Sequence, residues 1–294
     1  MALIDTWRSA LDPERVMETR IIHWQEESAT ERQDYLAVEE PLEIRLQHQS
    51  LAVIMRTPGN DLELALGFLL SEGVIKEASD VVALSNDSDA DGLPLENVVN
   101  VTLRPELAQN GASSAQQESR PISFERHFAV SSSCGLCGKN SIADLVLSVP
   151  PLEADAITIP AHSLYALDGQ LRAQQAVFQH TGGLHAAGLF ALDGQLQLLR
   201  EDVGRHNAVD KLIGHGLLHD ALPYRERILL VSGRTSFEII QKAFIARIPC
   251  IVAISAPSSL AVELADKAGI TLVGFLRNHA MNVYTHANRI CKIP

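Results

Sequence analysis

The sequence predicts an α/β protein in which a sheet covered by helices follows a smaller α+β segment. Short apolar strands alternate with helical patterns between residues 227 and 276, and this alternation is typical of a mainly parallel sheet flanked by helices. The strands are unbroken apolar runs, as strands buried on both faces are. A polar stretch over 109–121, QNGASSAQQESRP, marks a domain boundary. We expect three parts: an extended or partly ordered N-terminal arm over 1–34, an α+β domain over 35–120 and a C-terminal domain over 121–294.

The elements of the N-terminal part are predicted from periodicity and turn residues. Alternation around Leu42-Glu43-Ile44-Arg45-Leu46 predicts a half-buried strand. Pro58-Gly59-Asn60 predicts a turn. The segment Asp61 to Glu72, DLELALGFLLSE, is apolar at most positions and is followed by Gly73, so we expect a largely buried helix with a glycine stop. Residues 85–94 are polar and predict a loop.

The C-terminal part carries the strongest fold signal. Its predicted elements are a strand over 227–233, a helix over 235–248 with Thr235 and Glu238 at capping-box spacing, a strand over 249–255, a helix from Ser258 or Ser259 to Ala268, and a strand over 270–276. Ligands of parallel sheets bind beyond the carboxyl ends of the strands. Serines and arginines at these ends could meet a phosphate, although ordinary helix caps have the same composition.

Composition excludes several classes of function. The net charge is −12 over 294 residues, which argues against nucleic-acid binding. Residues 200–294 nevertheless carry 12 basic and 8 acidic side chains, a net charge of +4, and could hold an anionic ligand. No apolar run approaches the roughly 18 residues that a membrane span needs. The first residues lack a secretion signal and there are four cysteines, so we expect a cytoplasmic protein without a disulfide scaffold.

Two cysteines three positions apart form the most unusual pattern in the chain. Cys134 and Cys137 lie in SSSCGLCGK, between glycines and before Lys139. A reactive cysteine needs a lowered pKa because the thiolate is the nucleophile. Residues 139–148 have helical apolar spacing, which would place both cysteines at a helix N-terminus beside a lysine. The pattern indicates sulfur chemistry or metal binding.

Two further segments concentrate polar chemistry. TGGLHAA places His185 in an apolar setting, and EDVGRHN combines Asp202, Arg205 and His206 before a predicted helix over 208–217. These residues and Arg234 could line an anion site or could be structural. The sequence leaves both interpretations open.

The motifs SSSCGLCGK, TGGLHAA, EDVGRHNAVDK, SGRTSFEIIQK and TLVGFLRNHAMNVYTH, in this order, resemble the formate dehydrogenase accessory sulfurtransferase family, FdhD, over about residues 35–290. The resemblance implies a sulfur carrier protein. A cysteine desulfurase would supply sulfur as a cysteine persulfide, and the carrier would pass it to the molybdenum cofactor, Mo-bis(molybdopterin guanine dinucleotide), of formate dehydrogenase. The resemblance also implies a C-terminal domain of cytidine-deaminase-like fold, a homodimer and no metal of its own.

The resemblance assigns roles to particular residues. The persulfide would form on Cys134, with Cys137 as its companion in sulfur transfer. The cofactor-binding residues would be Phe275, Leu276, Arg277, Asn278, His279 and Ala280. His279-Ala280 stands where such segments commonly have Gly-Arg, which removes one arginine from the phosphate contacts.

Other functions remain to be weighed. The sequence argues against a zinc deaminase, even if the fold is shared, because no His or Cys is followed two positions later by Glu. A structural zinc site lacks a second CxxC or a histidine pair at finger spacing. A thioredoxin-like oxidoreductase carries its CxxC after an early strand, whereas about 130 residues come first here. The sequence argues against these last two alternatives but leaves them open, together with a third, a cofactor-binding chaperone for formate dehydrogenase without covalent sulfur transfer.

Overall fold

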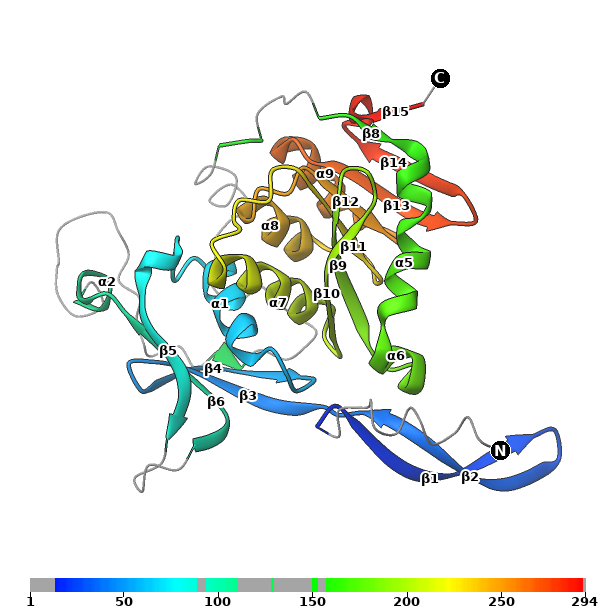
Figure 1. The fold of residues 1–294 in the computed structure, drawn as a ribbon, viewed down its shortest axis with the longest axis horizontal. Coiled ribbons are helices and arrows are strands. Elements are labelled where there is room, and N and C mark those ends of the chain that lie inside the picture. Colours follow the sequence, from blue (N-terminus) through cyan, green and yellow to red (C-terminus); the bar gives the residue numbers. More distant parts are fainter. Residues whose placement is uncertain (1–13, 89–93, 110–127, 130–149, 153–156, 293–294) are drawn as a thin grey trace.

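Four sheets organise the part of the chain that the computed structural model describes, residues 14–88, 94–109, 128–129, 150–152 and 157–292 (Figure 1). The five-stranded N-terminal sheet has the order β5-β6-β3-β4-β7. Its strands are β3 (Glu40–Leu46), β4 (Gln49–Arg56), β5 (Val81–Ser88), β6 (Pro94–Leu103) and β7 (Phe128–Ala129). In β3 the alternate residues Leu42, Ile44 and Leu46 are buried, which confirms the predicted strand.

Three helices accompany this sheet: α1 (Asp61–Ser71), the 3₁₀ helix η1 (Ala78–Asp80) and α2 (Pro105–Gln109). Helix α1 confirms the predicted buried helix, and Gly73 follows it with φ +73°, a conformation that favours glycine. The predicted loop over 85–94 is partly wrong, because residues 85–88 continue β5 and Pro94 begins β6. β5 lies at the edge of this sheet, where a polar sequence is common in strands.

The described part of the predicted N-terminal arm is a β-hairpin. Strands β1 (Val16–Gln25) and β2 (Ser28–Ala37) pair only with each other, antiparallel, and the hairpin extends away from the rest of the molecule near α6 (Figure 1). Both faces are largely exposed, so its sequence has no clean alternation of apolar and polar residues. Trp24 is 67% exposed.

The large C-terminal sheet has the order β10-β9-β11-β12-β13-β14. Its strands are β9 (His185–Ala191), β10 (Leu196–Asp202), β11 (Arg227–Val231), β12 (Cys250–Ala253), β13 (Thr271–Arg277) and β14 (Ala280–Thr285). The three central strands β11, β12 and β13 are parallel, as predicted, but the other three pairings are antiparallel. The prediction of a mainly parallel sheet is therefore wrong for the sheet as a whole. Short turns join β9 to β10 and β13 to β14, and only antiparallel strands can be joined in this way.

Helices cover both faces of this sheet (Figure 1). One face carries α7 (Arg205–Leu218), α8 (Phe237–Ile245) and α9 (Ser259–Ala268), and the other carries α4 (Ala161–Tyr165), α5 (Leu167–Gln174) and α6 (Ala176–Thr181). Ser258 caps α9 through a bond from Ala261 N and Gly269 ends it, as predicted. The predicted capping box of α8 is wrong, because Ser236 is its N-cap residue. Thr235 instead pairs through its backbone with the segment after β12.

The C-terminal end of the described chain adds a 3₁₀ helix, η2 (Ala287–Arg289), and a short parallel pair of β8 (Ile159–Pro160) with β15 (Ile290–Cys291). The helix predicted over 139–148 and the boundary predicted near residue 120 lie outside the described residues. Helix α1 packs directly on α7, and one hydrophobic core runs through both the N-terminal sheet and the C-terminal sheet. The likeness of the C-terminal part to the cytidine-deaminase fold stays a prediction.

The crossing of α1 and α7 depends on two glycines. A Cβ atom on Gly67 would lie 1.9 Å from Asp210 O, and one on Gly214 would lie 1.8 Å from Glu63 O. No real Cβ approaches a backbone oxygen so closely, so both positions need glycine. The close crossing joins the two parts of the chain into one packed unit.

Candidate functional site

Neither predicted sulfur-bearing residue lies in the described part of the chain. Cys134 and Cys137 belong to residues 130–149, which the structure does not describe. The site described below is therefore the region that the sequence predicted for an anionic ligand. It lies at the carboxyl ends of the parallel strands.

Three helices begin at this edge of the large sheet. The segments that follow β11 and β12 lie beside each other and beside the last part of β13, because Thr235 N donates to Ala256 O and Phe275 N donates to Ser255 O. β10 ends at the same edge, since Asp202 pairs with His185 and Ala187 pairs with Val231. The N-termini of α7, α8 and α9 follow these strand ends, and backbone N–H groups at such ends attract anions.

Arg205 and two histidines form a cluster at this edge, hereafter the Arg205 cluster (His185, Arg205 and His206). A Cβ on Gly233 would lie 3.2 Å from His185 Nδ1 and 3.5 Å from Arg205 Cδ, so this glycine makes room for both side chains. His206 Nε2 lies 3.1 Å from Ser236 Oγ at the start of α8. Arg205 Nε is buried and has no hydrogen-bond partner among the described residues. A buried donor without an acceptor is costly, and a ligand oxygen would satisfy it.

The histidines of the Arg205 cluster are neutral near pH 7. Burial, together with the positive charges of Arg205 and Lys242, lowers the pKa of His206 to about 4. Burial and Arg205 also lower the pKa of His185, against an opposing effect of Asp202. The carboxylate of Glu238 lies 3.8 Å from His206 Nε2. Burial acts to raise the pKa of Glu238, but Ser236, its own backbone N–H and nearby positive charge stabilise the carboxylate. The pKa of Glu238 is therefore lowered. Arg205 is thus the cationic member of a cluster with neutral imidazoles.

The predicted cofactor-binding segment forms the end of β13, a tight turn and the start of β14. Leu276 is 1% exposed and belongs to the core on the α5 side of the sheet, so it does not face solvent. Arg277 lies over the ring of Phe275, with 5.9 Å between its guanidinium carbon and the ring centroid. Arg277, Asn278, His279 and Ala280 are all exposed. Asn278 and His279 also have positive φ.

His279 meets Tyr165 edge to face, with ring centroids 5.7 Å apart. Among the described residues, no hydrogen bond or ion pair joins the turn at 275–280 to the Arg205 cluster. The two groups lie at the same edge of the sheet but remain separate. Arg234 is exposed beside Gly233.

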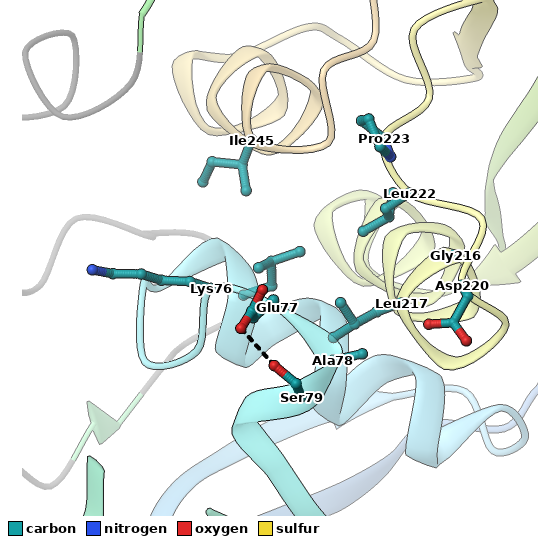
Figure 2. A pocket seen from close by; sticks show the side chains of 11 residues that line it. Lys76, Glu77, Ala78, Ser79, Gly216, Leu217, Asp220, Leu222, Pro223 and Ile245 are labelled. Carbon is teal, nitrogen blue, oxygen red and sulfur yellow. Dashed lines mark hydrogen bonds between the residues drawn. The ribbon is translucent and has the colours of Figure 1, made fainter. Parts of the chain in front are cut away.

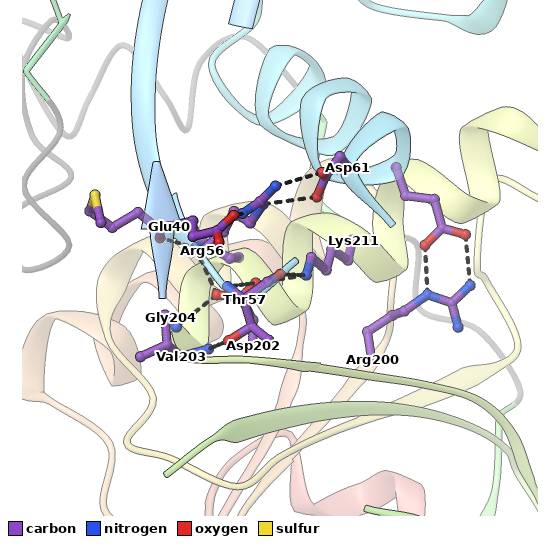
Figure 3. A network of polar contacts seen from close by, with 12 residues as sticks. Glu40, Arg56, Thr57, Asp61, Arg200, Asp202, Val203, Gly204 and Lys211 are labelled. Atoms are coloured by element: carbon purple, nitrogen blue, oxygen red, sulfur yellow. Dashed lines mark hydrogen bonds and ion pairs between the residues drawn. The ribbon is translucent and has the colours of Figure 1, made fainter. Parts of the chain in front are cut away.

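The structure places Asp202 in a buried polar network rather than in an open site (Figure 3). Its carboxylate accepts hydrogen bonds from Thr57 N, Gly204 N and Asn207 Nδ2 and lies 2.7 Å from Lys211 Nζ. Asp202 and Lys211 are both 0% exposed, and burial lowers the pKa of Lys211 although Asp202 opposes this. For Asp202 the structural interpretation is therefore correct.

Sequence reasoning missed Thr57, Asn207 and Lys211, which complete this network. Thr57 is separated from Asp202 by 145 positions in the chain. No local pattern connects them. The only signal was the density of polar residues in EDVGRHNAVDK, a segment that also contains Asn207 and Lys211.

Two cavities lie away from the edge. One of about 430 Å³ lies between η1, the C-terminal end of α7 and Ile245 of α8 (Figure 2). The other, of about 700 Å³, lies beside Arg56 and is lined mainly by polar and acidic groups.

Within the described ranges, no three His, Cys, Asp or Glu side chains are grouped to hold a metal ion, and no helix is long and apolar enough to cross a membrane.

Comparison with known proteins places the chain in a family. The FdhD/NarQ family matches residues 37–291. A protein of Nocardia farcinica named sulfur carrier protein FdhD is 52% identical over 264 residues, which are 88% of this chain and 89% of that protein. A protein of the same name from Sulfolobus acidocaldarius is 47% identical and covers 88% of this chain and 92% of its own.

A solved structure shares the fold. It is provisionally assigned as a formate dehydrogenase accessory protein from Desulfotalea psychrophila, with a TM-score of 0.69 and 24% identity, and the match covers 94% of this chain and 100% of that one. At this identity the structural likeness shows the fold alone. The sequence matches carry the assignment, and the chain belongs to the FdhD/NarQ family.

Proposed function

We propose that this protein is a sulfur carrier that serves formate dehydrogenase. Sulfur reaches Cys134 as a persulfide from a cysteine desulfurase and passes to Mo-bis(molybdopterin guanine dinucleotide), which is the acceptor and therefore cargo. The observation that carries the proposal is the match to relatives named sulfur carrier protein FdhD along nearly 90% of the chain. We place this activity in the cytoplasm, in a homodimer.

The edge of the large sheet suits the anionic part of such a cargo. Arg205 Nε and Thr235 Oγ1 are buried polar atoms without partners among the described residues. Gly233 leaves the space in which Arg205 and His185 lie. A diphosphate could be met by Arg205, by Arg277 and by the backbone N–H groups that begin α8 and α9. The neutral histidines can donate hydrogen bonds without adding charge.

The sulfur steps follow from the two cysteines. The Cys134 thiolate attacks the terminal sulfur of the donor persulfide, so that one S–S bond breaks, another forms, and the donor leaves as a thiolate. If Cys137 then attacks Cys134, a disulfide forms and the terminal sulfur leaves as hydrosulfide, carrying the electron pair. A thiol reductant must afterwards return the disulfide to two thiols. The second step rests on the CxxC spacing.

Intact-protein mass spectrometry tests the proposal. The protein is incubated with a cysteine desulfurase and L-cysteine, and wild type is compared with Cys134→Ala. We expect an added mass of about 32 Da on wild type that is lost on reduction and absent from the variant. Without any adduct on wild type while the desulfurase is active, the carrier role is contradicted and a cofactor-binding chaperone becomes the function to test.

The role of Cys137 is tested separately. Cys137→Ser protein is loaded with sulfur and freed of small-molecule thiols, and the release of hydrosulfide is followed over time. We expect loading at the wild-type level and slower release, because no neighbouring thiolate can displace the sulfur. Release at the wild-type rate contradicts the disulfide step while leaving Cys134 as the carrier.

A further inference from the structure

The end of β4 and the start of α7 are joined by buried and partly buried hydrogen bonds that the proposed function does not use (Figure 3). Thr57 N donates to Asp202 Oδ2 at 3.2 Å, and Val203 N donates to Thr57 Oγ1 at 3.2 Å. Asn207 Nδ2 donates to Met55 O at 2.8 Å. Backbone and side-chain groups from β4 thus hold the chain on both sides of the α7 start.

Lys211 and Gly204 complete this arrangement. Lys211 Nζ lies 2.7 Å from Asp202 Oδ2 and donates to Thr57 O at 2.8 Å. Gly204 N donates to Asp202 Oδ1 at 2.8 Å. A Cβ on Gly204 would lie 2.8 Å from Asn207 Nδ2, so the glycine allows this close approach. Hydrogen bonds in a buried, fully paired network fix geometry strongly. We call Thr57, Asp202, Asn207 and Lys211 the β4–α7 clamp.

The clamp holds the chain on both sides of the cationic side chain of the site, with Asp202 before Arg205 and Asn207 after it. Val203 and Gly204 are held by it, and the next two residues, Arg205 and His206, are the first residues of α7. Because Arg205 follows a fixed turn, the direction of its side chain depends on that turn. The same applies to His206, whose ring reaches Ser236 at the start of α8.

The clamp is anchored in the N-terminal sheet. Arg56, next to Thr57, is 2% exposed and binds Asp61 through two hydrogen bonds of 3.0 and 2.8 Å. Arg56 also lies 3.3 Å from Glu40 in β3. The last residues of β4 are therefore fixed on the N-terminal side before they contact α7.

We propose that the β4–α7 clamp is a positioning element, through which the N-terminal sheet orients Arg205 and His206 toward the anionic acceptor. The part about the acceptor rests on the proposed function. The part about orientation concerns the free protein and is independent of it. Thr57 Oγ1 is the group that can be removed with least other change, since valine has nearly the same shape as threonine.

The test compares Thr57→Val with Thr285→Val. Thr57→Val removes the acceptor of Val203 N–H, whereas Thr285→Val makes the same change in β14 and removes the acceptor of Leu272 N–H, at 3.0 Å and away from residues 202–206. Both variants should lower Tm by a similar few degrees. Thr57→Ser keeps the hydroxyl and should behave as wild type.

Two readouts separate positioning from general stability. The first is the NMR titration of His206 without ligand. Its low pKa depends on burial and on the positions of Arg205, Lys242, Glu238 and His185, so loosening the α7 start in Thr57→Val should raise it by about 0.5 unit or more toward its ordinary value. The second is calorimetric binding of guanosine diphosphate, which should weaken about tenfold in Thr57→Val. Neither should change in Thr285→Val.

The outcomes are distinct. An unchanged His206 titration in Thr57→Val overturns the inference, and so do equal changes in Thr57→Val and Thr285→Val. If wild type does not bind guanosine diphosphate, the cofactor part of the proposed function is contradicted. The ligand-free titration then decides the orientation claim by itself.

Discussion

Asp202 and Lys211 form an ion pair that is 0% exposed on both sides. Removing one partner leaves an uncompensated buried charge, which typically costs about 3 to 5 kcal/mol. We expect Asp202→Ala to lose about this much free energy of unfolding, measured by urea denaturation. The matched control is Glu263→Ala, which breaks a pair with Lys267 of the same 2.7 Å length whose side chains are more than half exposed. That change should cost less than about 1 kcal/mol. Equal losses in the two variants contradict the prediction.

His206 predicts a pH dependence of stability. Its pKa is about 4 in the folded protein, against 6.5 as the ordinary value. Between pH 4 and pH 6.5 the unfolded chain binds more protons at this residue than the folded protein does. The contribution of neutral His206 to the free energy of unfolding is therefore complete above pH 6.5 and is lost as pH falls toward 4. The 2.5-unit difference corresponds to about 3 kcal/mol as an order of magnitude.

We expect His206→Gln to reduce the loss of unfolding free energy between pH 7 and pH 4.5. Some slope should remain because the pKa of His185 is also lowered. Urea denaturation of both proteins across this range measures the effect. Identical slopes for wild type and variant would show that His206 is not buried in its neutral form.

At the scale of helices and strands, the α1–α7 crossing makes the sharpest prediction. Gly67→Ala and Gly214→Ala each place a methyl group within 2 Å of a backbone oxygen of the facing helix. The helices must move apart, and we expect each variant to lose about 3 kcal/mol or more. In contrast, Gly169 in α5 is exposed and has nothing within 4 Å of its Cβ position. Gly169→Ala should gain about 0.5 to 1 kcal/mol by restricting the unfolded chain.

Thermal unfolding of the three glycine variants, followed by circular dichroism, provides the comparison. A destabilised Gly169→Ala, or an unaffected Gly214→Ala, would contradict the packing argument. All three substitutions add the same methyl group to a helix, yet we expect Gly169→Ala to raise the free energy of unfolding and the other two to lower it. A difference in sign therefore reports the packing around each glycine.

For the whole molecule we predict a single cooperative unfolding transition. One core runs from Leu42 in the N-terminal sheet to Leu272 in the C-terminal sheet. The β4–α7 clamp and the bond from Ser71 to Asp210 add polar contacts between the two parts. The calorimetric and van't Hoff enthalpies should therefore agree. Two resolved transitions would mean that the parts unfold independently, and a chain cut to residues 121–294 would then fold without α1.

Several elements follow from the sequence by itself. α1, β11, β12, β13 and α9 were predictable because their apolar periodicity, glycine stops and caps are local signals. The order of motifs also identified the family. Cys134 and Cys137 remain the predicted sulfur-bearing residues on this basis, and Phe275 to Ala280 the predicted cofactor segment.

The tertiary structure decided what each polar residue does. Asp202, Arg205 and His206 are close together in the sequence, yet Asp202 is saturated by hydrogen bonds, Arg205 keeps a buried Nε without a described partner, and His206 is neutral. These differences arise from burial and from contacts with Thr57, Gly233 and Lys242, which lie far away in the chain. Local sequence determines helices and strands through backbone periodicity, whereas burial, charge state and contact depend on distant segments that only folding brings together.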